Sequence, residues 1–120
     1  MTNVLIDTCG WVAVVEARIN IDLALQSQLG IIEIKVTQSV MYELEHLATK
    51  DSRNLLLDLL NERGELVSGE GEHTDDELLN LAVSNQWPVL TVDKDLKNRL
   101  FNANASVIEV HGSKTLRFIE

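Results

Sequence analysis

Six acidic side chains stand where a carboxylate could take part in chemistry. Each lies at the end of an apolar run, at the start of a helical segment, or within the apolar face of one. They are Asp7, Glu43, Asp75, Asp76, Asp93 and Asp95. Carboxylates packed together repel unless a cation compensates, and hard oxygen ligands select Mg²⁺ or Mn²⁺ over zinc. Such an ion can bind a phosphate and activate water, so the pattern predicts phosphodiester hydrolysis.

Asp7 and Asp93 occupy equivalent places, since Asp7 ends the run NVLID and Asp93 follows PVLTV. Either residue could cap the helix that comes next, and either could point from a rigid strand end towards a ligand. Asp93 shares a helical face with Leu96 and Leu100, whereas Asp95 falls nearer the solvent side. Of two acids close together in the sequence, such as Asp93 and Asp95, we expect one to face the site and the other to cap the helix.

Glu43 interrupts an apolar helical face formed with Val40, Leu44 and Leu47. Two interpretations are open for it. The aliphatic stem could pack while the carboxylate reaches water, or the carboxylate could point inwards and be functional.

Asp75 and Asp76 begin another helical segment, where Thr74 and Glu77 predict a T-x-x-E capping box. Acids in a first helical turn also interact favourably with the helix dipole. Asp75 shares the face of the apolar residues that follow, including Leu78, so it is the better site candidate of the two.

Secondary-structure patterns predict an α/β fold. Apolar, β-branched runs predict strands at 3–7, 31–37, 65–68, 88–92 and 106–110. Helical periodicity predicts helices at 10–18, 21–29, 39–48, 53–64, 75–86 and 95–102, with Ser39 as an N-cap and residues 111–120 as a tail. Alternating helices and continuously apolar strands predict a mostly parallel sheet with helices on both faces. Ligands bind such sheets at the carboxyl ends of the strands, the edge to which these acids are delivered.

Composition limits the function further. The 120 residues, 45% of them hydrophobic, suffice for a single domain spanning 1–120. A net charge of −9 argues against a basic surface for polyanions, so nucleic-acid contact should be local or bridged by cations.

Cys9 is the only cysteine, and we expect it to be a buried small hydrophobe. Without a signal peptide or membrane-span pattern, we expect a cytoplasmic protein with no membrane partner.

The motifs, taken in order along most of the chain, resemble the PIN domain, a small metal-dependent nuclease fold. The similar segments are VLIDTCGWV, VTQSVMYELEHLA, HTDDELLNLAVSNQWPVLTVDKDLKNRL and SVIEV. The H-x-D-D junction and TVDKDLK resemble the archaeal and ribosome-biogenesis-like branch more than the VapC toxin-like branch. Membership of a toxin and antitoxin pair stays open, because the branches share catalytic motifs.

The resemblance implies a three-layer α/β/α sandwich and a Mg²⁺- or Mn²⁺-dependent endoribonuclease acting on RNA. The implied metal-binding acids are Asp7, Glu43, Asp75 and Asp93, with Asp76 and Asp95 as supporting or alternative positions and Thr91 as a polar neighbour. The alternative function is a PIN-fold binding module with little or no turnover in an RNA-processing or ribosome-assembly complex. Retention of all four acids favours the enzyme, and the scarcity of basic residues favours the module.

Partners are less defined by the sequence. The resemblance makes an antitoxin, an RNA-processing complex and a homodimer candidate partners. An apolar stripe could serve as the dimer interface or as core; it consists of Leu55, Leu56, Leu59 and Leu60. Basic residues near the proposed site could guide phosphate or could be ordinary surface charges; they are Lys94, Lys97, Arg99, Lys114 and Arg117.

Overall fold

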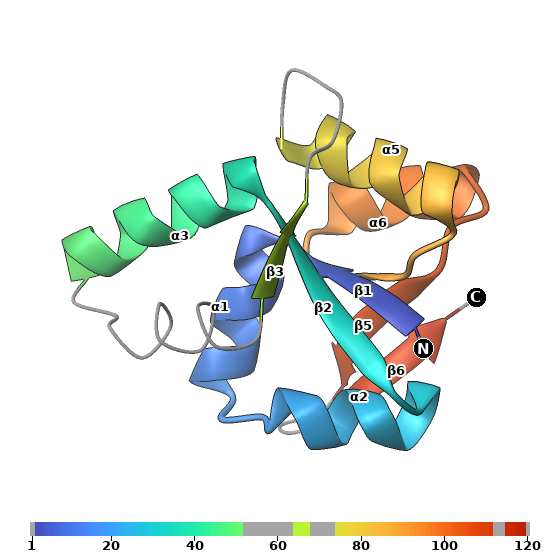
Figure 1. Cartoon of the computed structure of the whole chain (residues 1–120), viewed down its shortest axis with the longest axis horizontal. Coiled ribbons are helices and arrows are strands. Elements are labelled where there is room, and N and C mark those ends of the chain that lie inside the picture. The colour runs from blue at the N-terminus through green and yellow to red at the C-terminus, as the bar shows by residue number, and fades with distance from the viewer. Residues whose placement is uncertain (1, 52–63, 68–73, 112–114, 120) are drawn as a thin grey trace.

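The chain folds around a six-stranded sheet with helices packed against it (Figure 1). The computed structural model describes residues 2–51, 64–67, 74–111 and 115–119. The strands are β1 (Thr2–Ile6), β2 (Ile32–Thr37), β3 (Gly64–Val67), β4 (Val89–Leu90), β5 (Val107–His111) and β6 (Thr115–Ile119). The described helices are α1 (Thr8–Glu16), α2 (Ile21–Leu29), α3 (Gln38–Asp51), α5 (Thr74–Asn85) and α6 (Lys94–Asn102). The predicted α/β class is confirmed.

The sheet has the strand order β3-β2-β1-β4-β5-β6. Strands β1 to β5 pair in parallel, and β5 pairs with β6 in antiparallel fashion. The chain builds the sheet outwards from β1 through β2 to β3, then returns to the other side of β1 for β4. The order therefore reverses between β1 and β4, and open α/β sheets bind ligands at the carboxyl end of such a switch point. Asp7 directly follows β1, and Asp93 lies just after β4.

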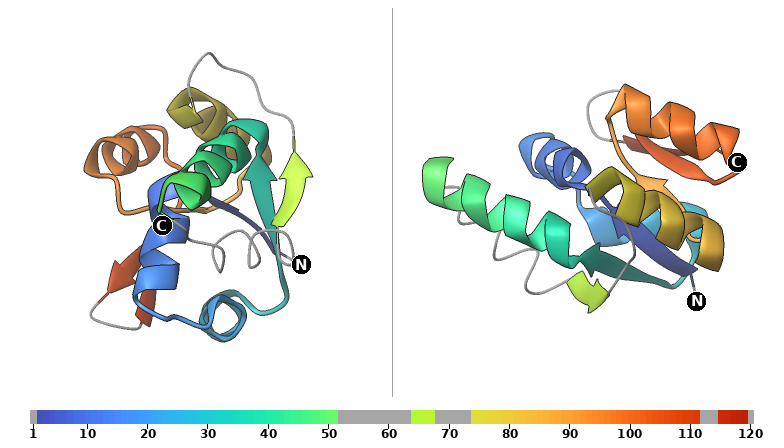
Figure 2. Two further views of the ribbon diagram at one scale, coloured as in Figure 1. Left: turned by 90° about the vertical axis from the view of Figure 1, so that its left-hand side faces the viewer. Right: turned by 90° about the horizontal axis from the view of Figure 1, so that it is seen from above.

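Helices cover both faces of the central strands. Helices α5 and α6 pack together on one side of the sheet, and α2 lies on the opposite side (Figures 1 and 2). The consecutive residues Val4, Leu5 and Ile6 of β1 are all fully buried. Successive strand residues point to opposite faces, so this burial requires both faces of β1 to be covered. None of the described helices is long and apolar enough to cross a membrane.

Three helices near the switch point begin at polar capping residues. Asp7 caps α1 and Asp93 caps α6, each through its carboxylate. Helix α3 starts at Gln38, where the hydroxyl of Thr37 accepts the N–H of Val40 at 3.2 Å. Thr37 thus has the role predicted for Ser39. That prediction was wrong because β2 runs into α3 without a loop, so the strand's last residue is also the cap.

The segment predicted to be a tail contains a strand instead. Residues Thr115–Ile119 form β6, in which Leu116 is buried and Arg117 is exposed, the alternation expected of a half-covered strand. The side chain of Gln28 in α2 donates to the carbonyl of Leu116 and accepts the N–H of Phe118. These bonds satisfy backbone groups of β6, which is the edge strand among the strands that the structure describes.

Some predicted features cannot be compared with the structure. Residues 53–63 of the helix predicted at 53–64, with its leucine stripe, lie outside the described residues, as does Lys114, whereas Gly64 begins β3 and is not helical. The dimer interface assigned to that stripe therefore stays a prediction. Within the described residues, β4 is shorter than the strand predicted at 88–92.

Gly10 permits a close approach between the start of α1 and the end of β4. A Cβ atom at this position would lie 2.5 Å from the Leu90 carbonyl oxygen and 2.8 Å from Asp7 Oδ1. A larger residue would separate the two elements. Because the approach is possible, Asp7 lies beside the β4–α6 turn, which carries Thr91 and Asp93.

Candidate active site

A pocket of about 500 Å³ opens at the carboxyl end of the central strands. Five acids line it: Asp7 follows β1, Glu16 ends α1, Glu43 lies on α3, Asp75 on α5, and Asp93 in the β4–α6 turn. Apolar side chains, among them Val12, form another part of the wall. The fold thus brings together the four carboxylates that the sequence pattern selects, although they are widely separated along the chain.

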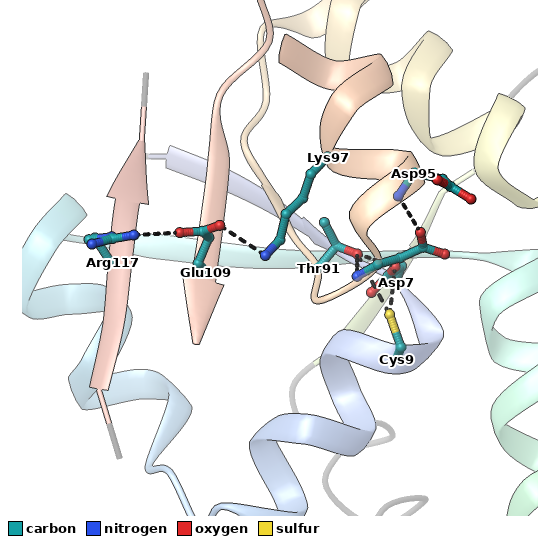
Figure 3. A network of polar contacts seen from close by, with 8 residues as sticks. Asp7, Cys9, Thr91, Asp95, Lys97, Glu109 and Arg117 are labelled. Atoms are coloured by element: carbon teal, nitrogen blue, oxygen red, sulfur yellow. Dashed lines mark hydrogen bonds and ion pairs between the residues drawn. The ribbon is translucent and has the colours of Figure 1, made fainter. Parts of the chain in front are cut away.

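Asp7 is buried, and three donors hold its carboxylate; Figure 3 shows two of them, Thr91 and Cys9. The backbone N–H of Gly10 donates to Oδ1 at 2.7 Å. The hydroxyl of Thr91 donates to Oδ2 at 2.5 Å, and the thiol of Cys9 donates to the same oxygen at 3.1 Å. Burial raises the pKa of Asp7, and these hydrogen bonds oppose the increase. A carboxylate has about four lone-pair directions, so about one is left for a ligand.

Thr91 connects Asp7 with Asp93. Its fully buried hydroxyl donates to Asp7 and accepts the N–H of Asp93 at 3.0 Å (Figure 3). Asp93 Oδ1 accepts the N–H groups of Asp95 and Leu96 at 2.8 and 3.2 Å. In the part of the chain that the structure describes, Oδ2 of Asp93 has no hydrogen-bond donor. Asp93 therefore both caps α6 and lines the pocket, while Asp95 is exposed. We had expected these two roles to be divided between Asp93 and Asp95.

Asp75 and Asp76 have different environments. Asp75 lines the pocket, whereas Asp76 pairs with Arg99 of α6 at 2.6 Å. Burial and then repulsion from Asp93 raise the pKa of Asp75, with Arg99 opposing the increase and Glu43 adding to it. Asp93 and Glu43 are therefore near enough to Asp75 to disfavour its ionisation, an effect that a cation in the pocket would offset.

The capping box predicted at the start of α5 is not formed within the described residues. Helix α5 begins at Thr74 itself, so Thr74 is the first helical residue and not the cap. Glu77 lies in the same turn, and its Oε1 atom is buried without a hydrogen-bond partner among the described residues. The prediction placed the helix start one residue too late.

Glu43 lies at the pocket rim with an exposed side chain. The hydroxyl of Thr8, the first residue of α1, donates to its Oε1 at 2.6 Å. Val40 and Leu44 of the same helix are fully buried. Glu43 is thus at the edge of the apolar face, and its carboxylate reaches both water and the pocket.

Known proteins share this arrangement of elements. A family model described as a PIN-like domain matches residues 4–113. The chain belongs to the PIN-like domain family. The solved structure of the PIN domain endonuclease Utp24 is similar to it, with a TM-score of 0.81 and 26% sequence identity over 97% of this chain and 90% of the Utp24 chain. No curated protein matches the sequence. The fold is therefore a PIN fold of the nuclease type.

Some polar residues of the pocket lining in this PIN-like domain were not predicted from the sequence, among them Thr8, Cys9 and Glu16. Thr8 received no role, and Cys9 was expected to be a buried hydrophobe. Cys9 is instead partly exposed, lines the pocket and donates to Asp7. Burial and the charge of Asp7 raise the pKa of the Cys9 thiol, which keeps it protonated as a donor. The signal that could have identified Thr8 and Cys9 was their position directly after a strand-terminal aspartate.

The basic residues near the pocket are largely committed to ion pairs within the PIN-like domain. Lys97 and Arg117 both contact Glu109 at 2.9 Å, and Arg99 pairs with Asp76 (Figure 3 shows the Glu109 network). Lys94 is exposed and makes no ion pair within the described residues. Three of the five basic residues that could have guided phosphate therefore pair with the protein's own acids, as ordinary surface charges do.

The donors around the pocket are carboxylate and hydroxyl oxygens with one thiol. This set suits a hard divalent cation, because Mg²⁺ and Mn²⁺ prefer oxygen ligands. No group of three or more His, Cys, Asp or Glu side chains among residues 2–51, 64–67, 74–111 and 115–119 is arranged to hold an ion by itself. Mg²⁺ sites commonly use one or two carboxylates and retain several waters, so the pocket fits an ion bound in that way.

Proposed function

We propose that this PIN-like domain is a Mg²⁺- or Mn²⁺-dependent endoribonuclease that hydrolyses RNA phosphodiester bonds. The observation that carries the proposal is the convergence of Asp7, Glu43, Asp75 and Asp93 on one pocket at the switch point of the sheet. Similarity to a PIN domain endonuclease supports the reaction class. The raised pKa of Asp75 supports the cation, since repulsion among the acids would be relieved by a positive charge.

The four acids differ in how many oxygens they have available. Asp7 uses both oxygens for internal hydrogen bonds, Asp93 keeps Oδ2, and Glu43 keeps Oε2. No hydrogen bond to the Asp75 carboxylate occurs within the described residues. We therefore assign direct metal contacts mainly to Asp75 and Asp93, with Glu43 contributing directly or through a bound water and Asp7 as a fixed anion behind them. When bound, the ion would hold the phosphate, lower the pKa of an attacking water and stabilise the leaving oxygen.

The protein's own groups determine how charge is arranged for this reaction. Asp7 is held in one orientation by three donors. One of them, the Thr91 hydroxyl, also accepts the N–H of Asp93 and so fixes Asp93 relative to Asp7. Fixed anions of this kind repel a bare phosphate, so RNA should enter only when a cation offsets them. This explains how an acidic chain with a net charge of −9 can act on a polyanion. The cellular setting that we propose is RNA processing or a toxin and antitoxin pair in the cytoplasm.

A binding module with little turnover is the second candidate. The commitment of Lys97, Arg99 and Arg117 to internal ion pairs favours it, because these cations are less available to RNA. Such a module would retain the acidic pocket and depend on partners for most of its contact with RNA.

Cleavage of short RNAs tests the proposal. Purified protein would be incubated with Mn²⁺ and a mixture of labelled single-stranded and hairpin RNAs. Asp93→Asn should abolish cleavage while still capping α6, since Asn and Asp are equivalent caps, and EDTA should abolish it too. Asp95→Asn is the matched control, because Asp95 begins the same helix but is exposed and outside the pocket lining.

Three other outcomes would change the conclusion. Normal cleavage by Asp93→Asn would remove Asp93 from the site. Loss of cleavage in Asp95→Asn alone would transfer its role to Asp95. Mn²⁺ binding without any cleavage by the wild-type protein would favour the binding module.

A further inference from the structure

The hydrogen bond between Thr8 and Glu43 joins two elements at the pocket rim. Thr8 Oγ1 lies 2.6 Å from Glu43 Oε1, within the range for a hydroxyl that donates to a carboxylate. The two residues are 35 positions apart, so the bond depends on the packing of α1 against α3. Both side chains line the same pocket.

Glu43 needs such a contact more than the other three acids do. Asp7 is buried and held by three donors, and Asp93 is held by two backbone N–H groups. Glu43 is exposed and has a longer side chain, which loses more rotamer freedom when it is fixed. Within the described residues, Thr8 supplies the one hydrogen bond to its carboxylate.

Thr8 is itself well fixed. It is β-branched, which restricts χ1, and it occupies the first turn of α1. That turn is held by the Asp7 cap and by the close approach of Gly10 to Leu90. The hydroxyl therefore comes from the same rigid turn that orients Asp7, and this turn sets the relative positions of Asp7 and Glu43.

We propose that Thr8 is a positioning residue that holds the Glu43 carboxylate ready for the divalent ion. This inference rests on the proposed metal-dependent function. Thr8 acts through Oε1, and Oε2 of Glu43 has no hydrogen bond among the described residues. Residues that orient metal ligands in this way change metal affinity about 10- to 100-fold when they are removed. For an exposed ligand such as Glu43 we expect the lower end of that range.

Mn²⁺ binding to the protein without RNA tests the role separately from catalysis. Free Mn²⁺ would be measured by electron paramagnetic resonance during titration of the wild type, Thr8→Val and Thr8→Ser. Thr8→Val keeps the shape of the side chain and removes the hydroxyl, so its dissociation constant should rise about tenfold. Thr8→Ser keeps the hydroxyl and should bind within about twofold of the wild type, because the donor is conserved.

A double-mutant cycle with Glu43→Ala separates positioning from a general effect on the fold. If Thr8 acts through Glu43, adding Thr8→Val to Glu43→Ala should not weaken Mn²⁺ binding further. Equal losses from Thr8→Val in both backgrounds would overturn the positioning role. So would wild-type affinity in Thr8→Val when Glu43→Ala binds more weakly.

The same titration distinguishes failure of this inference from failure of the proposed function. Mn²⁺ binding that is lost in Asp93→Asn but unchanged in Thr8→Val would overturn only the role of Thr8. Absence of Mn²⁺ binding by the wild type, or full binding by Asp93→Asn and Glu43→Ala, would overturn the metal site and the positioning role together.

Discussion

Replacing Thr91 by valine would remove the bridge between Asp7 and Asp93. Valine has nearly the shape of threonine but no hydroxyl, so the packing of this fully buried side chain would change little. The donor to Asp7 Oδ2 and the acceptor for the Asp93 N–H would both disappear. Thr91→Ser is the matched control, because it retains the hydroxyl and loses only a methyl group.

The size of the effect follows from these two bonds. A hydrogen bond to a charged group contributes about 1.5–3 kcal/mol, and a neutral one about 1 kcal/mol. Thr91→Val should therefore lower the free energy of unfolding by about 2.5–4 kcal/mol. With an unfolding entropy of about 0.25 kcal/mol per kelvin for a chain of this length, the Tm should fall by about 10–16 °C. Thr91→Ser should cost about 1 kcal/mol for the buried methyl group.

The loss should also depend on pH, because Asp7 must be ionised for the stronger bond. Burial raises the pKa of Asp7 and the Thr91 hydroxyl opposes that increase, so Thr91→Val should raise this pKa further. A raised native-state pKa means that stability falls as pH rises through it. The stability difference between Thr91→Val and Thr91→Ser should therefore be smallest at the acid end of the pH range and largest at neutral pH.

Urea unfolding of both variants in EDTA, followed by circular dichroism from pH 4 to 8, measures this difference without a bound metal. A Thr91→Val protein at least as stable as Thr91→Ser at pH 7 would refute the role assigned to the buried hydroxyl. A difference that did not change with pH would show that the ionised form of Asp7 is not the partner that matters.

Two further predictions concern charged groups around the site. Asp75→Asn should reduce Mn²⁺-dependent cleavage at least tenfold, on the order found for lost metal contacts. The free energy of unfolding without metal should be equal or higher, because burial and the charge of Asp93 raise the pKa of Asp75. Asp76→Asn breaks a partly exposed pair with Arg99 worth at most about 1 kcal/mol and should retain most activity; equal losses of initial rate in the two variants would contradict the assignment. The pKa of Glu109 is lowered by its two cationic partners, so its stabilising effect exists above the unfolded-state pKa and disappears as the pH falls through the native-state value. Urea midpoints of Glu109→Gln and the wild type should differ at pH 7 and converge as the pH falls through the native-state pKa of Glu109. A difference that stayed constant over the whole acidic range would show that ionisation of this residue is not the cause.

The sequence by itself determined the types and order of most elements. Hydrophobic runs and helical periodicity are local properties, so β1, β2, α2 and α6 could be recognised within a residue or two. The consecutive apolar residues 4–6 indicated a strand covered on both faces, which implied the central parallel sheet. Local patterns also placed Asp7 and Asp93 after strands. Two features were missed: the cap of α3, which depends on one hydrogen bond, and β6, which pairs with β5 along its whole length.

Only the tertiary structure decided which side chains meet. Thr91 lies 84 positions from Asp7, and Thr8 lies 35 from Glu43, so no local pattern connects them. Their contacts depend on the parallel pairing of β1 with β4 and on the packing of α1 against α3. The pairing of basic side chains with nearby acids is decided in the same way. Sequence periodicity specifies which face of an element is apolar, but register and packing specify which polar atoms on different elements come within hydrogen-bonding distance.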